Sequence, residues 1–228
     1  KEYARLAPYL SGQRVDGVLM VAVHSDDTLP DQLEALAIPT VLAGRRGDRE
    51  PLGHVRADNR GGAGSAVRHL LASGRRTVGT ITGPLDMEAA RERLDGYREA
   101  LREAGASVTE ELVANGDFTE EGGRAAMREL LDRRPDLDAV FAASDVMASG
   151  AVLELRAAGR RVPGDVAVIG FDDSIVARHI DPPLTSVRQP LEEMGRTMAR
   201  LLLDEIADRG AGHRGVVLPT RLVVRESA

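Results

Sequence analysis

Short apolar runs recur along this chain and alternate with longer amphipathic segments, and this alternation limits the folds that the chain can adopt. Each run has the length of a β-strand and is apolar at consecutive positions rather than at every second one. Strands of that kind are covered on both faces, as in parallel sheets. The predicted strands are residues 17–23, 39–43, 77–81, 137–142 and 165–170.

The segments between these runs carry apolar residues at helical spacing. Most of them stop at a glycine or just before a proline, which commonly end helices. Strands and helices that alternate at this spacing indicate βαβ units in an open, mostly parallel α/β sheet. The apolar stripes are 66–71 before Gly74, 94–101 before Gly105, 127–131 before Pro135, 146–155 before Gly159, and 191–202.

Composition excludes several classes of function. The chain has 228 residues, no cysteine and a formal net charge of −6. The lack of cysteine excludes disulfides and thiolate metal sites, and an acidic balance is unusual for a free-standing DNA-binding domain. No segment is long and apolar enough to cross a membrane. No metal site is expected either, because the histidines lack metal-ligand spacing: His24, His54, His69, His179 and His213.

Polar residues follow three of the predicted strands, where open α/β sheets bind their ligands. Asp172 and Asp173 follow one strand, and Ser144 and Asp145 follow another. A third strand leads through Gly83 into a segment that carries Arg91 and Arg93. Carboxylates accept hydroxyl hydrogen bonds and arginine donates through a planar fork, so the set suits a polyhydroxy or carboxylate-bearing ligand.

The same residues also have a purely structural interpretation. Asp173 can cap a short segment at 174–178, and Ser144 or Asp145 can cap the helix that follows them. Asp58 and Asn59 stand before two glycines and are interpreted as a helix start. Strand-end Asp and Ser residues are more often caps than ligand contacts.

The sequence gives little support for an enzyme. Gly61, Gly62 and Gly64 do not have the G-x-G-x-x-G spacing of a dinucleotide loop, and there is no P-loop and no G-x-S-x-G motif. We therefore predict no catalytic residues and no cofactor. Residue patterns alone indicate an α/β ligand-binding protein rather than an enzyme such as a nucleotide-dependent dehydrogenase.

Several blocks, in order along nearly the whole chain, resemble the LacI/GalR family of transcriptional regulators. Residues 58–62 are similar to its D-N-x-x-G-G block, and residues 69–76 to H-L-x-x-x-G-H-R, with Arg75 in place of the usual histidine. The stretch 162–173, VPGDVAVIGFDD, is the most specific of them. Further blocks of resemblance are 93–97, 116–123, 144–151, 182–187 and 218–225.

The resemblance implies a two-lobed periplasmic-binding-protein-like fold, with a mostly parallel sheet in each lobe and three crossings between lobes. By analogy, the crossings lie near 57–58, 188–189 and 215–218. The N-terminal lobe then comprises residues 1–57 plus 189–215, and the C-terminal lobe 58–188 plus 216–228. An effector is expected in the cleft between the two lobes.

The resemblance also assigns effector-binding residues. Arg93 matches the family's ligand-binding arginine, Asp172 its ligand-binding aspartate, and Phe118 the aromatic residue that packs on the ligand. Ser144 stands where asparagine is common, and Gly44 where other members carry aspartate, so Gly44 offers no side chain for that contact. Two variable positions complete the set, Met87 and Ala89. Replacing Arg93 is expected to weaken effector binding while leaving the fold intact.

The resemblance further implies a homodimeric, cytoplasmic repressor with a sugar as its effector. Members of the family begin with a DNA-binding headpiece, followed by a strand, a helix and a second strand that precede the segment equivalent to Glu2–Leu10. We expect the complete protein to contain these parts and to reach operator DNA through its headpiece. Apolar residues of 2–10 are candidates for the dimer interface. The alternative is a periplasmic sugar-binding protein of a transporter.

Overall fold

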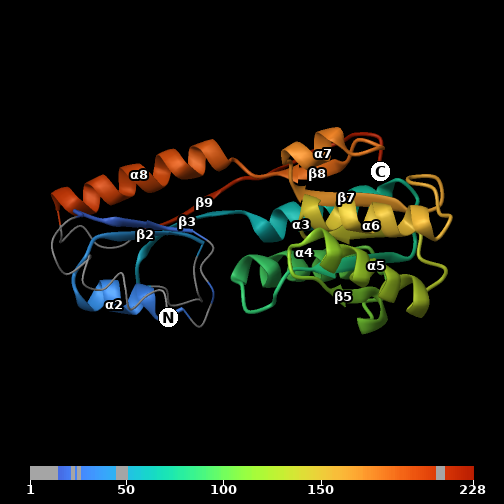
Figure 1. The fold of residues 1–228 in the computed structure, drawn as a ribbon, viewed down its shortest axis with the longest axis horizontal. Helices are drawn as coiled ribbons and strands as arrows, with labels where there is room; N and C mark the ends of the chain where they lie inside the picture. Colours follow the sequence, from blue (N-terminus) through green and yellow to red (C-terminus); the bar gives the residue numbers. More distant parts are fainter. Residues whose placement is uncertain (1–14, 22–23, 25–26, 45–50, 209–213) are drawn as a thin grey trace. The chain divides into compact units, whose positions relative to one another are not determined.

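In the computed structural model the chain divides into two compact units, each built from two segments (Figure 1). The first unit comprises Lys1–Ala57 and Pro190–Leu218, and the second Asp58–Gln189 and Pro219–Ala228. The structure describes residues 15–21, 24, 27–44, 51–208 and 214–228.

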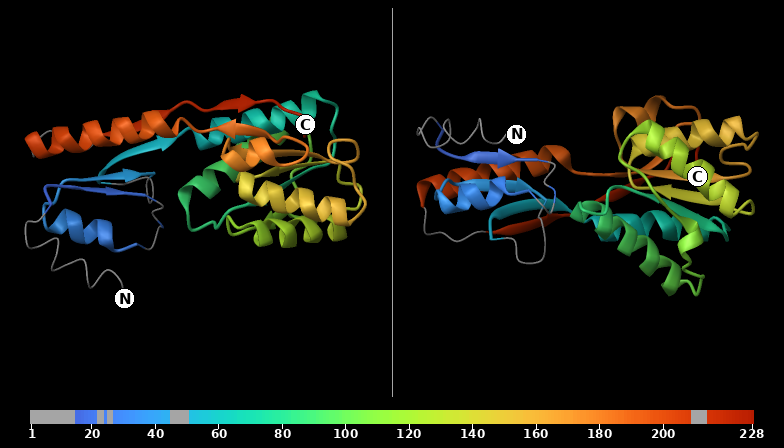
Figure 2. Two further views of the ribbon diagram at one scale, coloured as in Figure 1. Left: turned by 45° about the horizontal axis from the view of Figure 1, so that its top comes forward. Right: turned by 60° about the horizontal axis from the view of Figure 1, so that its bottom comes forward.

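The first unit contains a four-stranded sheet in the order β1-β2-β3-β9, and all its neighbouring strands pair in parallel. Helix α8 (Leu191–Ala207) covers one face with Met198 and Leu201, while α2 (Leu29–Ala35) lies on the other (Figure 2). The strands are β1 (Val18–Met20), β2 (Thr40–Ala43), β3 (Gly53–Ala57) and β9 (Gly215–Leu218).

The second unit contains a six-stranded sheet in the order β10-β8-β7-β6-β4-β5, in which only β10 is antiparallel to its neighbour. The strands are β4 (Val78–Thr82), β5 (Val113–Asn115), β6 (Ala139–Ala142), β7 (Ala167–Asp172), β8 (Thr185–Arg188) and β10 (Arg221–Val223). The helices are α3 (Asn59–Ala72), α4 (Glu88–Glu103), α5 (Glu120–Arg133), α6 (Asp145–Ala157) and the short α7 (Ile175–His179), with one 3-10 turn, Glu110–Leu112.

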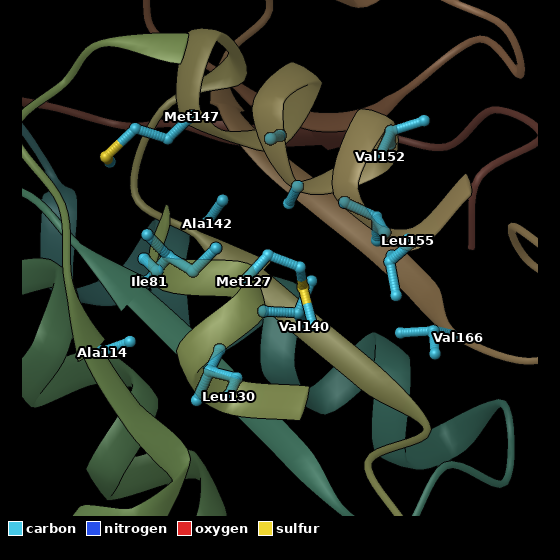
Figure 3. Packing of buried hydrophobic residues seen from close by; sticks show 14 of the residues in the cluster. Ile81, Ala114, Met127, Leu130, Val140, Ala142, Met147, Val152, Leu155 and Val166 are labelled. Carbon is cyan, nitrogen blue, oxygen red and sulfur yellow. The ribbon is translucent and has the colours of Figure 1, made fainter. Parts of the chain in front are cut away.

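Two apolar cores cover the two faces of this sheet. Helices α3 and α4 pack on one face, around Tyr97, Phe141 and Phe171. Helices α5 and α6 pack on the other, where Figure 3 shows Met127 and Leu155 among side chains of the strands. The central strands β4, β6 and β7 are therefore buried on both sides, as their continuous apolar runs predict.

Helices α5 and α6 approach each other closely because both carry glycine at the contact. A Cβ atom on Gly150 would lie 2.0 Å from the backbone oxygen of Glu120. A Cβ atom on Gly123 would lie 2.2 Å from the backbone oxygen of Met147. The absence of side chains at these two positions lets the two helices pack backbone to backbone.

The five predicted strands and five predicted helices are confirmed, with shifts of a few residues at their ends. The sequence missed β3, β5, β8, β9 and β10, and the short α2. The last boundary between units falls after Leu218 rather than after Gly215, because Val216, Val217 and Leu218 pair with β3. The segment of the first unit that ends at Leu218 begins at Pro190, so Gln189 belongs to the second unit rather than to the first.

The segment proposed for dimer contacts, residues 2–10, lies outside the described residues, as does His213. No helix among the residues that the structure describes is long and apolar enough to span a membrane.

Candidate functional site

The strand order of the second unit brings most of the predicted site residues to one edge of its sheet. Strands β7, β6, β4 and β5 are parallel neighbours, so their carboxyl ends lie side by side. Asp172 ends β7, Ser144 follows β6, and Phe118 follows β5. Met87 and Ala89 lie after β4, at the start of α4. This edge is where open parallel sheets bind ligands.

Arg93 lies on α4 and is 5% exposed, so its guanidinium group must be satisfied within the protein. Its Nε donates to Asn59 Oδ1 at 3.0 Å, and its Nη1 donates to the backbone oxygen of Ala143 at 2.6 Å. The guanidinium carbon lies 3.7 Å from the centre of the Phe171 ring, which is a cation–π contact. Burial lowers the pKa of Arg93, and the charge of Asp172 opposes this shift. The guanidinium is thus fixed between α3, β6 and β7.

Asp172 lies beside this guanidinium, with its Oδ1 3.7 Å from Arg93 Nη1. The same oxygen accepts a hydrogen bond from Gln189 Nε2 at 2.6 Å. Burial raises the pKa of Asp172, while Arg93 and Gln189 counteract that rise. Its φ is 114°, which is rare for a residue with a side chain, and such strain is found most often at functional sites. The side chain is 29% exposed, which leaves acceptor capacity for a ligand.

Phe118 supplies an apolar surface at the same edge. Its ring packs directly on the backbone of Gly83, where a Cβ atom would lie 2.1 Å from the ring. Its own φ is 66°, and its amide donates to the sulfur of Met147 at 3.3 Å. An aromatic surface at the same sheet edge as the carboxylate and guanidinium groups is suited to the apolar face of a ring-shaped polar ligand.

Ser144 has the structural role that the sequence suggested for it. It is the N-cap of α6, and its Oγ accepts a hydrogen bond from the amide of Met147 at 3.2 Å. The Ser144 hydroxyl can still donate its proton in a hydrogen bond to a ligand. Met87 is the N-cap position of α4 without a side-chain cap bond, and both Met87 and Ala89 are half-buried. Contact of these three residues with a ligand remains a prediction.

Two residues of the site were missed from the sequence, Asn59 and Gln189. Asp58 is the N-cap of α3, as predicted, and accepts from the amide of Gly61 at 2.9 Å. Asn59, however, is buried and holds Arg93 with Oδ1 while its Nδ2 donates to Glu92 Oε2 at 3.0 Å. The D-N pair of residues 58–59 was the available signal for the role of Asn59.

The predicted cap at Asp173 is wrong, and of the two candidates Ser144 and Asp145 it is Ser144 that caps α6. Asp145 caps no helix: its Oδ1 accepts from Ser186 Oγ at 2.6 Å and its Oδ2 from the amide of Ser174 at 2.7 Å. Burial raises the pKa of Asp145 to about 6. Asp173 does not cap α7, whose N-cap is Ser174, but forms ion pairs with Arg188 and Arg225. Both carboxylates therefore belong to buried polar networks behind the strand ends.

Gly44 lies in the first unit, immediately after β2. Its φ of 101° is one that glycine adopts readily. Within the described part of the chain, no group of three or more His, Cys, Asp or Glu residues could hold a metal ion. The site thus offers a fixed cation, a carboxylate and an aromatic surface, which together suit the binding of a hydroxylated small molecule.

A parallel α/β unit with such groups at its strand ends defines a small-molecule-binding domain, and comparison with known proteins agrees. Residues 67–228 match the family model of the periplasmic binding protein-like domain. The chain is 54% identical over 228 residues to the HTH-type transcriptional regulator CelR of Thermobifida fusca, which covers 99% of this chain and 67% of that protein. It is 36% identical to the HTH-type transcriptional repressor CytR of Escherichia coli K12, over 94% of this chain and 63% of that protein.

Solved structures give the same result. A complex of the transcriptional regulator CelR with cellobiose has a TM-score of 0.96 and 53% identity, and it covers all of this chain and 70% of that one. A LacI-family regulatory protein from Chloroflexus aggregans has a TM-score of 0.90 and 31% identity, with 100% and 83% covered. The chain belongs to the LacI family of transcriptional regulators and contains their periplasmic binding protein-like domain.

The family assignment bears on the alternatives. The chain spans about two thirds of the length of the curated relatives named above. These relatives are transcriptional regulators rather than enzymes or transport proteins. The alternative of a transporter's periplasmic sugar-binding protein is therefore not favoured.

Proposed function

We propose that this chain is the effector-sensing core of a LacI-type repressor and that Arg93 and Asp172 hold a sugar. The observation that carries the proposal is the pair formed by the buried Arg93 guanidinium and the Asp172 carboxylate. Arg93 is immobilised by Asn59 and Ala143, while Asp172 keeps a partly exposed carboxylate 3.7 Å away. A fixed donor next to a fixed acceptor matches adjacent hydroxyl groups on a sugar ring, each of which can both donate and accept.

A β-linked glucose disaccharide is the first candidate for the effector. A transcriptional regulator CelR, 53% identical to this chain, has been solved in complex with cellobiose. Phe118 presents an aromatic surface that suits the apolar face of a pyranose ring. Met87, Ala89 and Ser144 are proposed to complete the contacts from the second unit.

The effector is proposed to bind in a cleft that residues of the first unit also line. Gly44 would lie on that side and leave space where a side chain would otherwise contact the ligand. Binding between units would change their relative orientation and so couple effector binding to DNA binding, with a typical coupling free energy of about 1–3 kcal/mol. No bond is made or broken, so the protein is proposed not to be an enzyme.

The complete protein is proposed to act in the cytoplasm as a homodimer. Operator DNA would be contacted through a helix-turn-helix headpiece, because the relatives CelR and CytR are named as HTH-type regulators. Dimerisation would place two headpieces on two half-sites, as is usual for such regulators.

The experiment has two parts, both on the full-length protein. A thermal-shift screen of cellobiose, other disaccharides, monosaccharides and nucleosides identifies the effector, because a ligand that binds only the native state raises its stability. An electrophoretic mobility shift with upstream DNA of its own gene then tests whether that effector changes DNA binding.

We expect cellobiose or a related β-glucoside to raise the unfolding temperature and to alter the mobility shift. The variant Asp172→Asn should lose the rise in unfolding temperature that the sugar causes. The variant Arg68→Gln, which replaces an exposed arginine of α3, should keep that rise. A response to nucleosides but to no sugar would contradict the assignment of the effector. DNA binding that no ligand changes would contradict the assignment as a sensor.

A further inference from the structure

A second group of charged side chains lies at the β10 edge of the sheet in the second unit, and the proposed effector site does not use it. At its centre is Asp173, whose side chain is fully buried. Arg225 Nη2 lies 2.5 Å from Oδ1, Arg188 Nε lies 2.5 Å from Oδ2, and Arg178 Nη2 lies 3.6 Å from Oδ2. Three guanidinium groups thus converge on one carboxylate.

A fourth arginine faces the same group across the sheet edge. Arg221 on β10 is paired with Arg188 on β8 in the antiparallel register. Side chains directly opposite each other in such a pair lie on the same face, and like charges in that position are destabilising. Arg221 is exposed and, within the described residues, forms no ion pair. The cross-strand pair therefore places the positive charges of Arg188 and Arg221 side by side, and among the described residues Arg221 has no acidic partner.

The charges of this group do not balance. Burial alone would raise the pKa of Asp173, but hydrogen bonds from Arg225 and Arg188 outweigh it and hold that pKa below its usual value. Asp173 is therefore ionised at neutral pH, and it is the only carboxylate within ion-pair distance of these arginines in the described part of the chain. Three guanidinium groups share the charge of Asp173, and Arg221 adds a fourth positive charge beside Arg188.

A purely structural role explains only half of these arginines. Arg225 also donates to the backbone oxygen of Leu184, at 2.7 Å, so Arg225 and Arg188 fasten the C-terminal segment and β8 to β7. Arg178 is 55% exposed and reaches Asp173 only at 3.6 Å, and Arg221 does not reach it at all. These two guanidinium groups add positive charge at the surface without a comparable bond inside the protein.

We propose that the exposed side of this group, Arg178, Arg188 and Arg221, is a binding site for a phosphate-bearing anion, separate from the effector site at Arg93. Guanidinium groups match phosphate oxygens with paired N–H donors, which adds both energy and geometric specificity to the recognition of phosphate. A bound dianion would neutralise the opposed charges of Arg188 and Arg221. The bound anion is either inorganic phosphate or a phosphorylated metabolite.

The test is isothermal titration calorimetry of the full-length protein with inorganic phosphate, with glucose 6-phosphate and with glucose, at constant ionic strength set with potassium chloride. Phosphate or glucose 6-phosphate should release or absorb heat with a saturable isotherm, and glucose should not compete for the same site. Tighter binding of glucose 6-phosphate than of phosphate identifies a metabolite as the source, and the reverse order identifies the free ion.

The variants Arg221→Gln and Arg178→Gln should each weaken this binding by at least about tenfold, since each removes a charged hydrogen-bond donor. The matched control Arg68→Gln removes an exposed arginine of α3 and should bind as the wild type does. Without phosphate and at low salt, Arg221→Gln should unfold at the same temperature as the wild type or a higher one, because it relieves the opposed pair.

Three results would overturn the proposal: no saturable binding of either anion, equal binding by Arg221→Gln and wild type, or destabilisation by Arg221→Gln without phosphate. The variant Arg221→Gln should keep the stabilisation by cellobiose that the wild type shows, so failure of this proposal and failure of the effector site can be distinguished.

Discussion

Replacement of Arg93 by glutamine tests how far the effector site and the core of the second unit depend on the same side chain. The substitution removes hydrogen bonds to Asn59 and Ala143, the 3.7 Å ion pair with Asp172 and the contact with the Phe171 ring. Breaking a buried ion pair costs about 3–5 kcal/mol. Because the Asp172 side chain is 29% exposed, we expect a loss near the lower end, about 3 kcal/mol.

Sugar binding should weaken at the same time. A hydrogen bond to a charged group contributes about 1.5–3 kcal/mol, which corresponds to a loss of affinity of roughly 10- to 150-fold. Urea denaturation followed by circular dichroism measures the free energy of unfolding, and calorimetry with cellobiose measures the affinity. The sequence alone predicts an intact fold in Arg93 variants, whereas these contacts predict a destabilised second unit.

A double-mutant cycle with Asp172→Asn isolates the pair from the other contacts. The double variant should lose less stability than the sum of the two single variants, by about 0.5–3 kcal/mol, because each single change leaves a buried partner unpaired. Strict additivity would show that the two side chains do not interact. An Arg93→Gln variant as stable as the wild type would refute the interpretation that Arg93 fastens α4 to β6.

Other predictions concern the surroundings of the site. Asn59→Ala should weaken sugar binding in calorimetry by several-fold without removing a direct ligand contact, because it frees Arg93 Nε, and unchanged affinity would contradict this. The Asp145 carboxyl should titrate near pH 6 in a carbon-13 NMR experiment, not below pH 4. Since this folded-state pKa is raised, the contribution of Asp145 to stability becomes more favourable as the pH falls from about 6 to about 4. Gly150→Ala should lower the free energy of unfolding by about 1–3 kcal/mol or more, because its Cβ would meet the Glu120 backbone, and a neutral effect in urea denaturation would contradict the close packing of α5 and α6.

Residue patterns predicted the elements that have strong periodicity. The runs of β4, β6 and β7 are apolar throughout because both faces of these strands are buried. The missed strands β8, β9 and β10 are three or four residues long; β9 and β10 lie at sheet edges, and β8 carries buried polar residues, Thr185 and Ser186. Tertiary pairing rather than local pattern makes them strands.

The site residues divide in the same way, into those that could be predicted from the sequence and those that could not. The strand-end rule indicated Asp172 and Ser144, and the family resemblance added Arg93, Phe118 and the two variable positions. No local pattern showed that Asn59 bonds Arg93, which is 34 residues away, or that Gln189 bonds Asp172, 17 residues away. A cap was assigned to Asp173, and Asp145 was considered beside Ser144, because a helix start is a local feature, whereas the buried partners of both carboxylates come from distant parts of the chain.

A crystal structure of the full-length protein with cellobiose tests the central claim most directly. We predict electron density for a sugar at the carboxyl ends of β4, β6 and β7, with hydroxyl groups within about 3.2 Å of the Arg93 guanidinium and the Asp172 carboxylate. We also predict that the ring of Phe118 contacts the sugar. A sugar bound without contact to Arg93 or Asp172 would contradict the account.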